Sequence, residues 1–223
     1  MVRALLFDFD GVLARTFAYH LRAWRETLGF DPDRLTLKWN EGQSACRIAQ
    51  ALCDKAGRPV DEATACRLAN QKGIRFRATQ KARVFPQIPT MIAKAKDHGL
   101  KLALVTGAQI ENLRAVLTDS LLEHFDVIVK DGDVPRGKPF PDPYLAAAEW
   151  LHLDPGDCLV IENAPLGIES AKSAGCLCIA LRTTLPKKYL LQADFILKHH
   201  DDLLRFMGES FAMQAHVSPC NPY

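Results

Sequence analysis

The chain has 223 residues, enough for one substantial hydrophobic core or for a core with a smaller inserted domain. Hydrophobic residues make up 48% and charged residues 24% of it, as in soluble globular proteins. No apolar stretch approaches the roughly 18 residues that would suggest a membrane span, so we do not expect a membrane partner. We expect no signal peptide, because Asp8 and Asp10 interrupt the first apolar run.

The cysteines follow neither a disulfide framework nor a zinc motif. Their number is odd, and the closest pair in sequence has no second pair to complete a metal site. We therefore expect reduced, mostly buried thiols and a cytoplasmic protein. The seven are Cys46, Cys53, Cys66, Cys158, Cys176, Cys178 and Cys220.

The first predicted strand, at residues 3–9, carries the most informative feature of the chain. Asp8 and Asp10 are two residues apart, so a strand projects both carboxylates to the same side. Gly11 follows and allows a sharp turn or the close approach of a ligand. Two carboxylates in such an apolar setting need compensation, and Mg²⁺ is a suitable partner. The alternative is an acidic turn without a ligand.

Residues 15–85 are predicted to be helical and to contain no strand. Apolar residues recur at helical spacing in the stripe formed by Phe17, Leu21, Trp24 and Leu28. This segment holds 14 Lys/Arg against 7 Asp/Glu, whereas the remainder holds 14 basic and 19 acidic residues. We infer a small basic domain facing an acidic body, an arrangement that favours an anionic substrate between them. Solvated basic helix faces are the alternative. Nucleic acid is not an expected partner, because the basic residues are dispersed.

The rest of the chain alternates between strands and helices, which predicts an α/β fold with a Rossmann-like, doubly wound parallel sheet. We expect a catalytic core from residues 1–14 and 86–207, a helical cap at 15–85 and a loosely ordered tail at 208–223. The further strands are predicted at 101–106, 126–129, 158–162, 177–181 and 194–197, and helices at 87–98, 109–118, 142–152 and 164–174.

Polar residues follow four of the predicted strands, and ligands gather at the carboxyl ends of strands in such sheets. Together these residues offer a carboxylate nucleophile, a second acid, a hydroxyl, a fixed cation and metal-binding oxygens. This combination suits phosphoryl transfer, where positioning and charge neutralisation dominate. The set comprises Asp8, Asp10, Thr106, Gly107, Lys138, Glu162 and Asn163.

The residues and their order resemble the haloacid dehalogenase superfamily, specifically its β-phosphoglucomutase-like branch with a helical cap after the first strand. The resemblance implies that Asp8 is the nucleophile that forms an aspartyl-phosphate and also binds Mg²⁺. It makes Asp10 the general acid/base, with a backbone carbonyl that ligates the metal. Thr106 would hold the phosphoryl oxygens, with the N–H of Gly107 nearby. Lys138 would neutralise the nucleophile and the phosphate.

The resemblance also assigns Glu162 and Asn163 to the acidic metal motif. Close relatives usually have Asp where this chain has Asn163, and Asn is also a good helix cap. Weaker Mg²⁺ binding is therefore expected. Glu162 either ligates the metal or reaches it through water.

In the cap, the resemblance points to His20, Trp24 and Lys72 as substrate-binding residues. Two of them have a structural alternative, since Trp24 lies on the apolar stripe and Lys72 fits a surface helix. His20 is offset from the stripe, so it either faces the active-site cleft or lies away from it. Ala45 stands where the mutase places an arginine for a second phosphate.

We therefore predict an Mg²⁺-dependent phosphatase that hydrolyses a small phosphorylated metabolite and is a monomer or weak dimer. A phosphosugar mutase is the main alternative, since it shares the aspartyl-phosphate but passes the phosphoryl group to a sugar hydroxyl. A non-catalytic binding protein on the same fold is less favoured, because the predicted catalytic residues are all present. A C–Cl hydrolase would need neither Asp10 nor a metal, and a phosphonate hydrolase would lack an acid at position 10.

Overall fold

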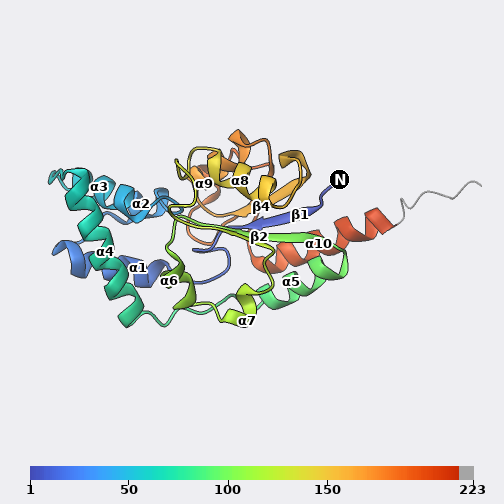
Figure 1. Ribbon diagram of the computed structural model, residues 1–223, viewed down its shortest axis with the longest axis horizontal. Helices are drawn as coiled ribbons and strands as arrows, with labels where there is room; N and C mark the ends of the chain where they lie inside the picture. Colours follow the sequence, from blue (N-terminus) through green and yellow to red (C-terminus); the bar gives the residue numbers. More distant parts are fainter. Residues whose placement is uncertain (216–223) are drawn as a thin grey trace, which may run out of the picture.

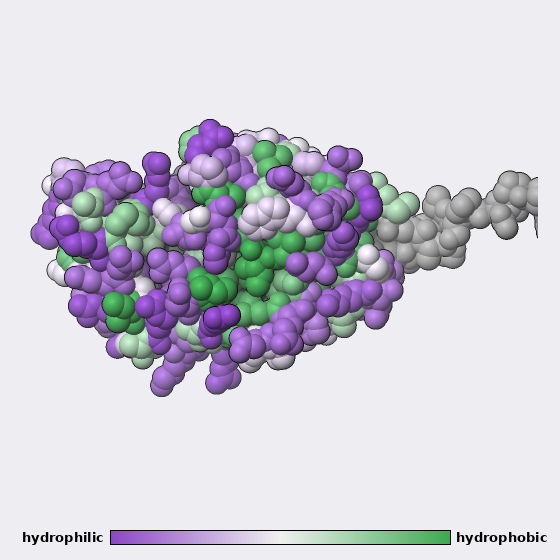
Figure 2. Space-filling view, viewed as in Figure 1, coloured by the Kyte–Doolittle hydropathy of each residue, from purple (hydrophilic) through white to green (hydrophobic). Residues whose placement is uncertain are grey.

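The computed structural model describes the backbone of residues 1–215 and the side chains of residues 1–209. A parallel sheet forms the centre of the molecule, helices cover both of its faces, and four more helices lie together at one end (Figure 1). On the face shown in Figure 2, hydrophilic side chains dominate the surface of these four helices, whereas apolar side chains gather over the sheet. Among the described residues, no helix combines the length and the apolar character needed to span a bilayer.

The sheet has six strands in the order β3-β2-β1-β4-β5-β6, and every neighbouring pair is parallel. The central strand β1 is buried on both faces, which explains why its sequence is a continuous apolar run. The chain moves outward from β1 in one direction and then, through β4, in the other, so the carboxyl ends of β1, β2 and β4 border a ligand-binding crevice. The strands are β1 (Ala4–Phe7), β2 (Lys101–Val105), β3 (Val127–Val129), β4 (Cys158–Glu162), β5 (Leu177–Leu181) and β6 (Phe195–Leu197).

Alternate side chains of β1 enter two hydrophobic cores, one on each face of the sheet. Leu5 and Phe7 pack with apolar residues of α5, α6, α7 and α10, and Leu6 packs with residues of α8 and α9. These helices are α5 (Ile88–Asp97), α6 (Ile110–Arg114), α7 (Asp119–Leu122), α8 (Asp142–Trp150), α9 (Pro165–Ser173) and α10 (His200–Ala215). Short 3₁₀ turns cover Pro155–Asp157 and Lys187–Tyr189.

The inserted helical cap has a hydrophobic core of its own. Leu21, Trp24, Leu37 and Leu52 lie in that core, which is separate from the two cores of the sheet. The two chain segments that join cap and sheet run side by side, since Ala14 forms a bridge with Val84. The residue bounds of the two domains stay a prediction. The cap helices are α1 (Phe17–Leu28), α2 (Arg34–Trp39), α3 (Ala45–Lys55) and α4 (Glu62–Thr79).

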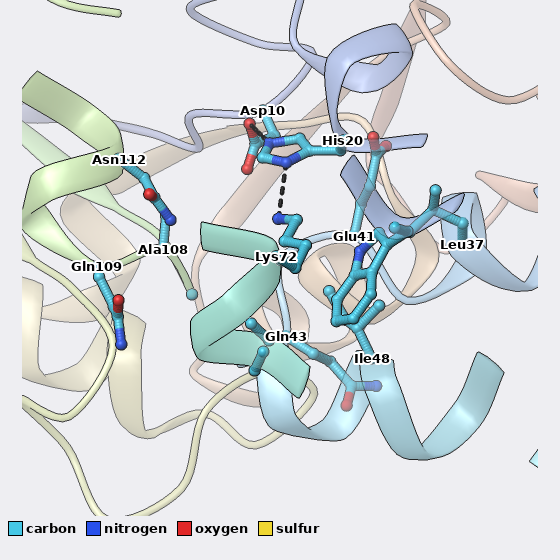
Figure 3. Close-up of a pocket in the computed structure, with 15 residues that line it drawn as sticks. Asp10, His20, Leu37, Glu41, Gln43, Ile48, Lys72, Ala108, Gln109 and Asn112 are labelled. Carbon is cyan, nitrogen blue, oxygen red and sulfur yellow. Dashed lines mark hydrogen bonds and ion pairs between the residues drawn. The ribbon is translucent and has the colours of Figure 1, made fainter. Parts of the chain in front are cut away.

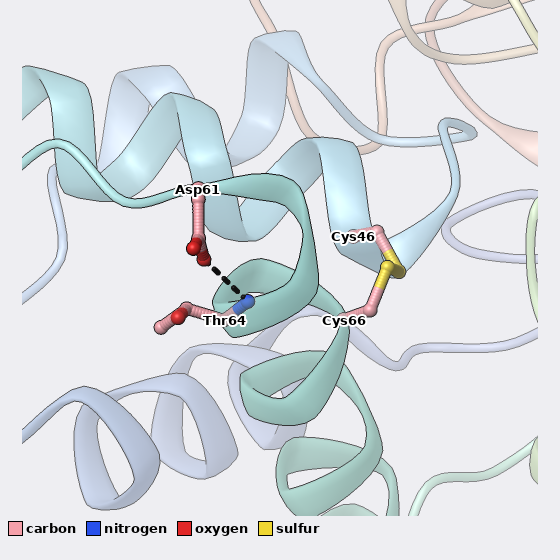
Figure 4. Close-up of a disulfide and its surroundings, with 4 residues drawn as sticks. All are labelled: Cys46, Asp61, Thr64 and Cys66. Atoms are coloured by element: carbon pink, nitrogen blue, oxygen red, sulfur yellow. Dashed lines mark hydrogen bonds between the residues drawn. A yellow bond between two sulfur atoms is a disulfide. The ribbon is translucent and has the colours of Figure 1, made fainter.

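The cap contains a disulfide bond between Cys46 and Cys66, which corrects the expectation that all thiols are reduced (Figure 4). The two residues are 20 positions apart, but the packing of α3 against α4 brings their Cα atoms to 4.6 Å. Asp61 fixes the start of α4 beside the bond by accepting a hydrogen bond from the Thr64 N–H (2.8 Å). Cys53, Cys158, Cys176 and Cys178 are free and buried, as expected, and Cys220 lies outside the described residues.

The C-terminal segment also differs from its prediction over part of its length. Helix α10 continues to Ala215, so residues 208–215 are helical and not loosely ordered. Apart from Gly208, this stretch is rich in good helix formers such as Ala, Met, Gln and Glu. Residues 216–223 of the predicted tail lie outside the described residues.

Candidate active site

The candidate site is organised around a buried lysine that contacts two carboxylates. Asp8 follows β1, Glu162 ends β4, and Lys138 lies in the loop between β3 and α8. The Lys138 Nζ donates to Asp8 Oδ1 and to Glu162 Oε1, both at 2.7 Å, and to the carbonyl of Val105 at 3.1 Å. Lys138, Asp8 and Glu162 are each at most 3% exposed. Three charges far apart in the sequence therefore meet at one edge of the sheet.

Burial and charge oppose each other in this group. Burial alone would lower the pKa of Lys138, but the charges of Asp8 and Glu162 outweigh it and raise that pKa. Burial, joined by the charges of Glu162 and Asp10, raises the pKa of Asp8 to about 8, although Lys138 acts in the opposite direction. The single ammonium group therefore does not fully compensate the carboxylates around it.

Protein donors occupy both oxygens of Glu162. Oε1 accepts from Lys138 and from the hydroxyl of Tyr144 (2.9 Å), and Oε2 accepts from the backbone N–H groups of Asn163 (2.8 Å) and Ala164 (3.2 Å). A carboxylate offers about four acceptor positions, so this one is saturated. Gly167 makes the arrangement possible, because a Cβ at that position would overlap the carboxylate. Glu162 thus orients Lys138 and the start of α9. Sequence reasoning did not find Tyr144.

Asn163 faces the cap domain. It is not the N-cap residue of helix α9, because Ala164 takes that position. Its Nδ2 donates to Thr184 Oγ1 at 2.9 Å and to Glu41 Oε2 at 3.2 Å. Its Oδ1 and the Glu41 Oε1 are both buried without a hydrogen-bond partner. Burial, with the nearby charges of Asp10 and Asp8, raises the pKa of Glu41 well above its ordinary value. Sequence reasoning missed Glu41, whose only signal was an acid directly before Gly42.

A chain of hydrogen bonds joins Asp10 to the cap (Figure 3). The His20 Nε2 lies 2.9 Å from Asp10 Oδ1, and the Lys72 Nζ lies 2.8 Å from the His20 Nδ1. Because an ammonium group can only donate, Nδ1 accepts and the Nε2–H donates to Asp10. Burial and the charge of Lys72 lower the pKa of His20, which favours this neutral tautomer. His20 also stacks on Phe76, with ring centroids 4.1 Å apart.

Thr106 and Gly107 form the turn that follows β2. The Thr106 Oγ1 accepts a hydrogen bond from the N–H of Ala108 (3.1 Å), so the hydroxyl already stabilises its own turn. A Cβ at Gly107 would overlap the backbone carbonyl oxygens of Gly42 and Gln43 in the cap. Only glycine therefore lets the cap segment rest on this turn.

Residues 2–175 match the sequence model of the haloacid dehalogenase-like hydrolase family. The chain belongs to this family. Protein CbbY of Rhodobacter capsulatus is 32% identical over 209 residues, which cover 87% of this chain and 89% of CbbY. Fructose-1-phosphate phosphatase YqaB of Escherichia coli K12 is 32% identical over 183 residues, or 80% of this chain and 95% of YqaB. The chain is therefore similar to curated relatives over most of their length.

A solved structure of similar fold is β-phosphoglucomutase from Clostridium difficile, which superimposes with a TM-score of 0.81 at 24% identity. The superposition covers 96% of this chain and 99% of that one. The comparison confirms the predicted class, an α/β Rossmann-like fold with an inserted helical cap.

Between its cap and its sheet domain this hydrolase has a cavity of about 50 Å³ (Figure 3). Asp10, His20 and Lys72 line it, as does Trp24, which is also fully buried in the core of the cap. Both interpretations of Trp24, packing and contact with a ligand, are thus compatible with its position. The other lining residues are Leu37, Glu41, Gly42, Gln43, Ala45, Ile48, Ala69, Gly107, Ala108, Gln109 and Asn112.

Proposed function

We propose that this hydrolase is an Mg²⁺-dependent phosphatase that acts on a small phosphorylated metabolite through an aspartyl-phosphate at Asp8. The observation that carries the proposal is the contact of Lys138 with both Asp8 and Glu162, each at 2.7 Å. A second acid, Asp10, follows Asp8 by two residues. A fixed ammonium beside a buried carboxylate suits a nucleophile that must meet an anionic phosphate. Similarity to a fructose-1-phosphate phosphatase supports a sugar phosphate or a similar phosphomonoester.

The donor set fits a magnesium ion. Among the described residues, no three His, Cys, Asp or Glu side chains form a complete metal cluster, but hard cations also accept amide and backbone oxygens. The Asn163 Oδ1 is buried without a partner, and the raised pKa of Asp8 calls for a further positive charge. Asp8, the backbone carbonyl of Asp10 and Asn163 would hold the ion. When bound, Mg²⁺ would offset repulsion between the phosphate and the attacking carboxylate.

In the first step the Asp8 carboxylate attacks phosphorus, and the bond to the leaving oxygen breaks. Asp10 donates its proton to that oxygen, so the leaving group departs as an alcohol. The Thr106 hydroxyl and the Gly107 N–H bind the phosphoryl oxygens, and Lys138 neutralises their charge. In the second step Asp10 takes a proton from water, which attacks the phosphorus of the aspartyl-phosphate. Inorganic phosphate leaves, and the Asp8 carboxylate is regenerated.

The cavity favours hydrolysis of a small substrate. Its volume is about 50 Å³, which corresponds to the space of only a few water molecules, since one buried water needs roughly 10–15 Å³. The amides of Gln43, Gln109 and Asn112 suit the hydroxyl groups of a sugar or polyol. No arginine lines the cavity in the part of the chain that the structure describes, and Ala45 is among the lining residues. A mutase must bind a second phosphate, so this lining favours the phosphatase over the mutase.

The test is hydrolysis of p-nitrophenyl phosphate with and without Mg²⁺. We expect Mg²⁺-dependent release of phosphate, and a loss of about a thousandfold or more in Asp8→Asn. Asp97→Asn, at an exposed aspartate of α5, is the matched control. Unchanged hydrolysis in Asp8→Asn would contradict the proposed nucleophile. Glucose 6-phosphate formed from β-glucose 1-phosphate with a trace of the 1,6-bisphosphate, beyond simple hydrolysis, would favour the mutase.

A further inference from the structure

The cap contributes one carboxylate to the acidic group of the core. Glu41 lies in the segment between α2 and α3, yet it is only 6% exposed and its Oε2 is 3.2 Å from the Asn163 Nδ2. Within residues 1–209 no Lys, Arg or His side chain forms an ion pair with Glu41. A buried carboxylate without a cation is costly. The described side chains therefore supply no cation for the carboxylate of Glu41.

The other acids of the site each have a hydrogen-bond partner with a basic side chain. Glu162 has donors on both oxygens, Asp8 accepts from Lys138, and Asp10 accepts from His20. Glu41 differs from them, because its neighbours are neutral groups: the amide of Asn163 and the hydroxyl of Thr184.

Glu41 and Asn163 each have one side-chain oxygen without a hydrogen bond. The Glu41 Oε1 and the Asn163 Oδ1 are both buried and both lack a hydrogen-bond partner. These are unpaired acceptors on two side chains in contact, one from the cap and one from the end of β4. A hard divalent cation satisfies two such oxygens and the missing positive charge at once.

We propose that Glu41 is a ligand of the divalent cation, so that the cap and the core hold the ion together. This inference rests on the proposed function, because it concerns the ion of that same site. Glu41 supplies the negative charge that the amide of Asn163 does not provide. Since Glu41 moves with the cap, binding of the cation favours the closed position of the cap, and closure of the cap strengthens binding of the cation.

The test is titration of the full-length protein with MgCl₂ in a calorimeter, without substrate. We expect Glu41→Gln to weaken Mg²⁺ binding by about tenfold or more, as loss of a charged ligand does. The matched control Glu149→Gln alters an exposed acid of α8 and should bind Mg²⁺ like the wild type. Adding Asn163→Asp to Glu41→Gln should restore binding, because it returns a carboxylate to the same place.

Thermal melting separates a ligand from a residue that only supports the fold. Without Mg²⁺, Glu41→Gln should melt no lower than the wild type, because it removes an uncompensated buried charge. With Mg²⁺, the wild type should gain more in melting temperature than the variant. The inference would be overturned if Glu41→Gln lowered the melting temperature equally with and without Mg²⁺. It would also be overturned if the folded variant bound Mg²⁺ with unchanged affinity.

The proposed function and this inference fail in different ways. A wild type that neither binds Mg²⁺ nor hydrolyses phosphomonoesters contradicts the proposed function, and the inference with it. A wild type that does both, beside a Glu41→Gln variant with the same Mg²⁺ affinity, contradicts the inference alone.

Discussion

Lys72 of α4 donates a hydrogen bond to the Nδ1 of His20 on α1, across 2.8 Å and in a buried setting. Its ammonium also lies 5.3 Å from the centre of the Trp24 ring. Lys72 thus lies beside the cavity while it fixes the orientation of the imidazole that reaches Asp10. The cap supplies both a cationic group that lines the cavity and the imidazole that contacts the proposed acid.

The position of Lys72 predicts a dependence of substrate binding on pH. Burial lowers the pKa of Lys72 to about 8, although Asp10 acts in the opposite direction. A lowered pKa means that the ammonium is present below about pH 8 and is lost above it. We expect KM for an anionic phosphomonoester to rise between pH 7 and 9. In Lys72→Met, KM should be high and nearly constant over this range, whereas Lys96→Met, on the exposed side of α5, should follow the wild type. A wild-type profile in Lys72→Met would contradict this role.

Loss of the imidazole should matter most for poor leaving groups. His20→Ala removes the hydrogen bond that orients Asp10, so proton donation to the leaving oxygen should suffer. We expect kcat for an alkyl phosphate such as glycerol phosphate to fall by about a hundredfold. p-Nitrophenol leaves without much help from an acid, so its ester should be affected far less. Comparing kcat for both esters in both proteins is the measurement, and equal losses would count against the link to Asp10.

A methyl group at position 107 should hinder closure of the cap. In Gly107→Ala the added carbon overlaps the carbonyl oxygens of Gly42 and Gln43. We expect kcat/KM to fall by about tenfold or more while the sheet domain keeps its melting temperature, because closure excludes water and completes the site. Gly156→Ala is the control, since its added Cβ meets no atom within 4 Å. Wild-type kinetics in Gly107→Ala would show that the contact is dispensable.

The disulfide should stabilise the cap under oxidising conditions. It closes a segment of 20 residues between Cys46 and Cys66, and a loop of this size corresponds to about 3 kcal/mol of unfolding free energy. We expect dithiothreitol to lower the melting temperature of the wild type but not that of the double variant Cys46→Ser/Cys66→Ser. Hydrogen exchange should locate the change in α3 and α4. If dithiothreitol left the melting temperature of both proteins unchanged, the disulfide bond would not be present in solution.

The centre of the sheet was largely predictable because its inner strands β1, β2 and β4 are buried on both faces. Such strands appear as short apolar runs, and the expected run at 158–162 becomes the strand β4 at Cys158–Glu162. The grouping of Asp8, Lys138 and Glu162 followed from the rule that the carboxyl ends of parallel strands share one edge. The structure brings these three together, while their chemical roles stay proposals.

Other features depend on packing that the sequence does not express. Glu41 is a single acid between two helices, and its place beside Asn163 depends on how the cap meets the core. The spacing of Cys46 and Cys66 in the sequence does not predict a disulfide bond. The two residues become neighbours only because α3 packs against α4. Helix α10 was not predicted at all, and its residues 208–215 were assigned to a loosely ordered tail because they lie near the end of the chain.

The cap segment at Gly42 and Gln43 rests on the turn that would hold the phosphate, and a Cβ at Gly42 would come within 2.9 Å of the Lys138 side chain. In the described position of the cap, these contacts fix how closely the wall of the cavity approaches Lys138 and the turn after β2. Ala45 and Ile48 line the same cavity, so exchanges there would reshape the space for the departing alcohol without altering Asp8 or Asp10. Substitutions at such positions alone could therefore change the substrate specificity of the enzyme, in evolution or by design.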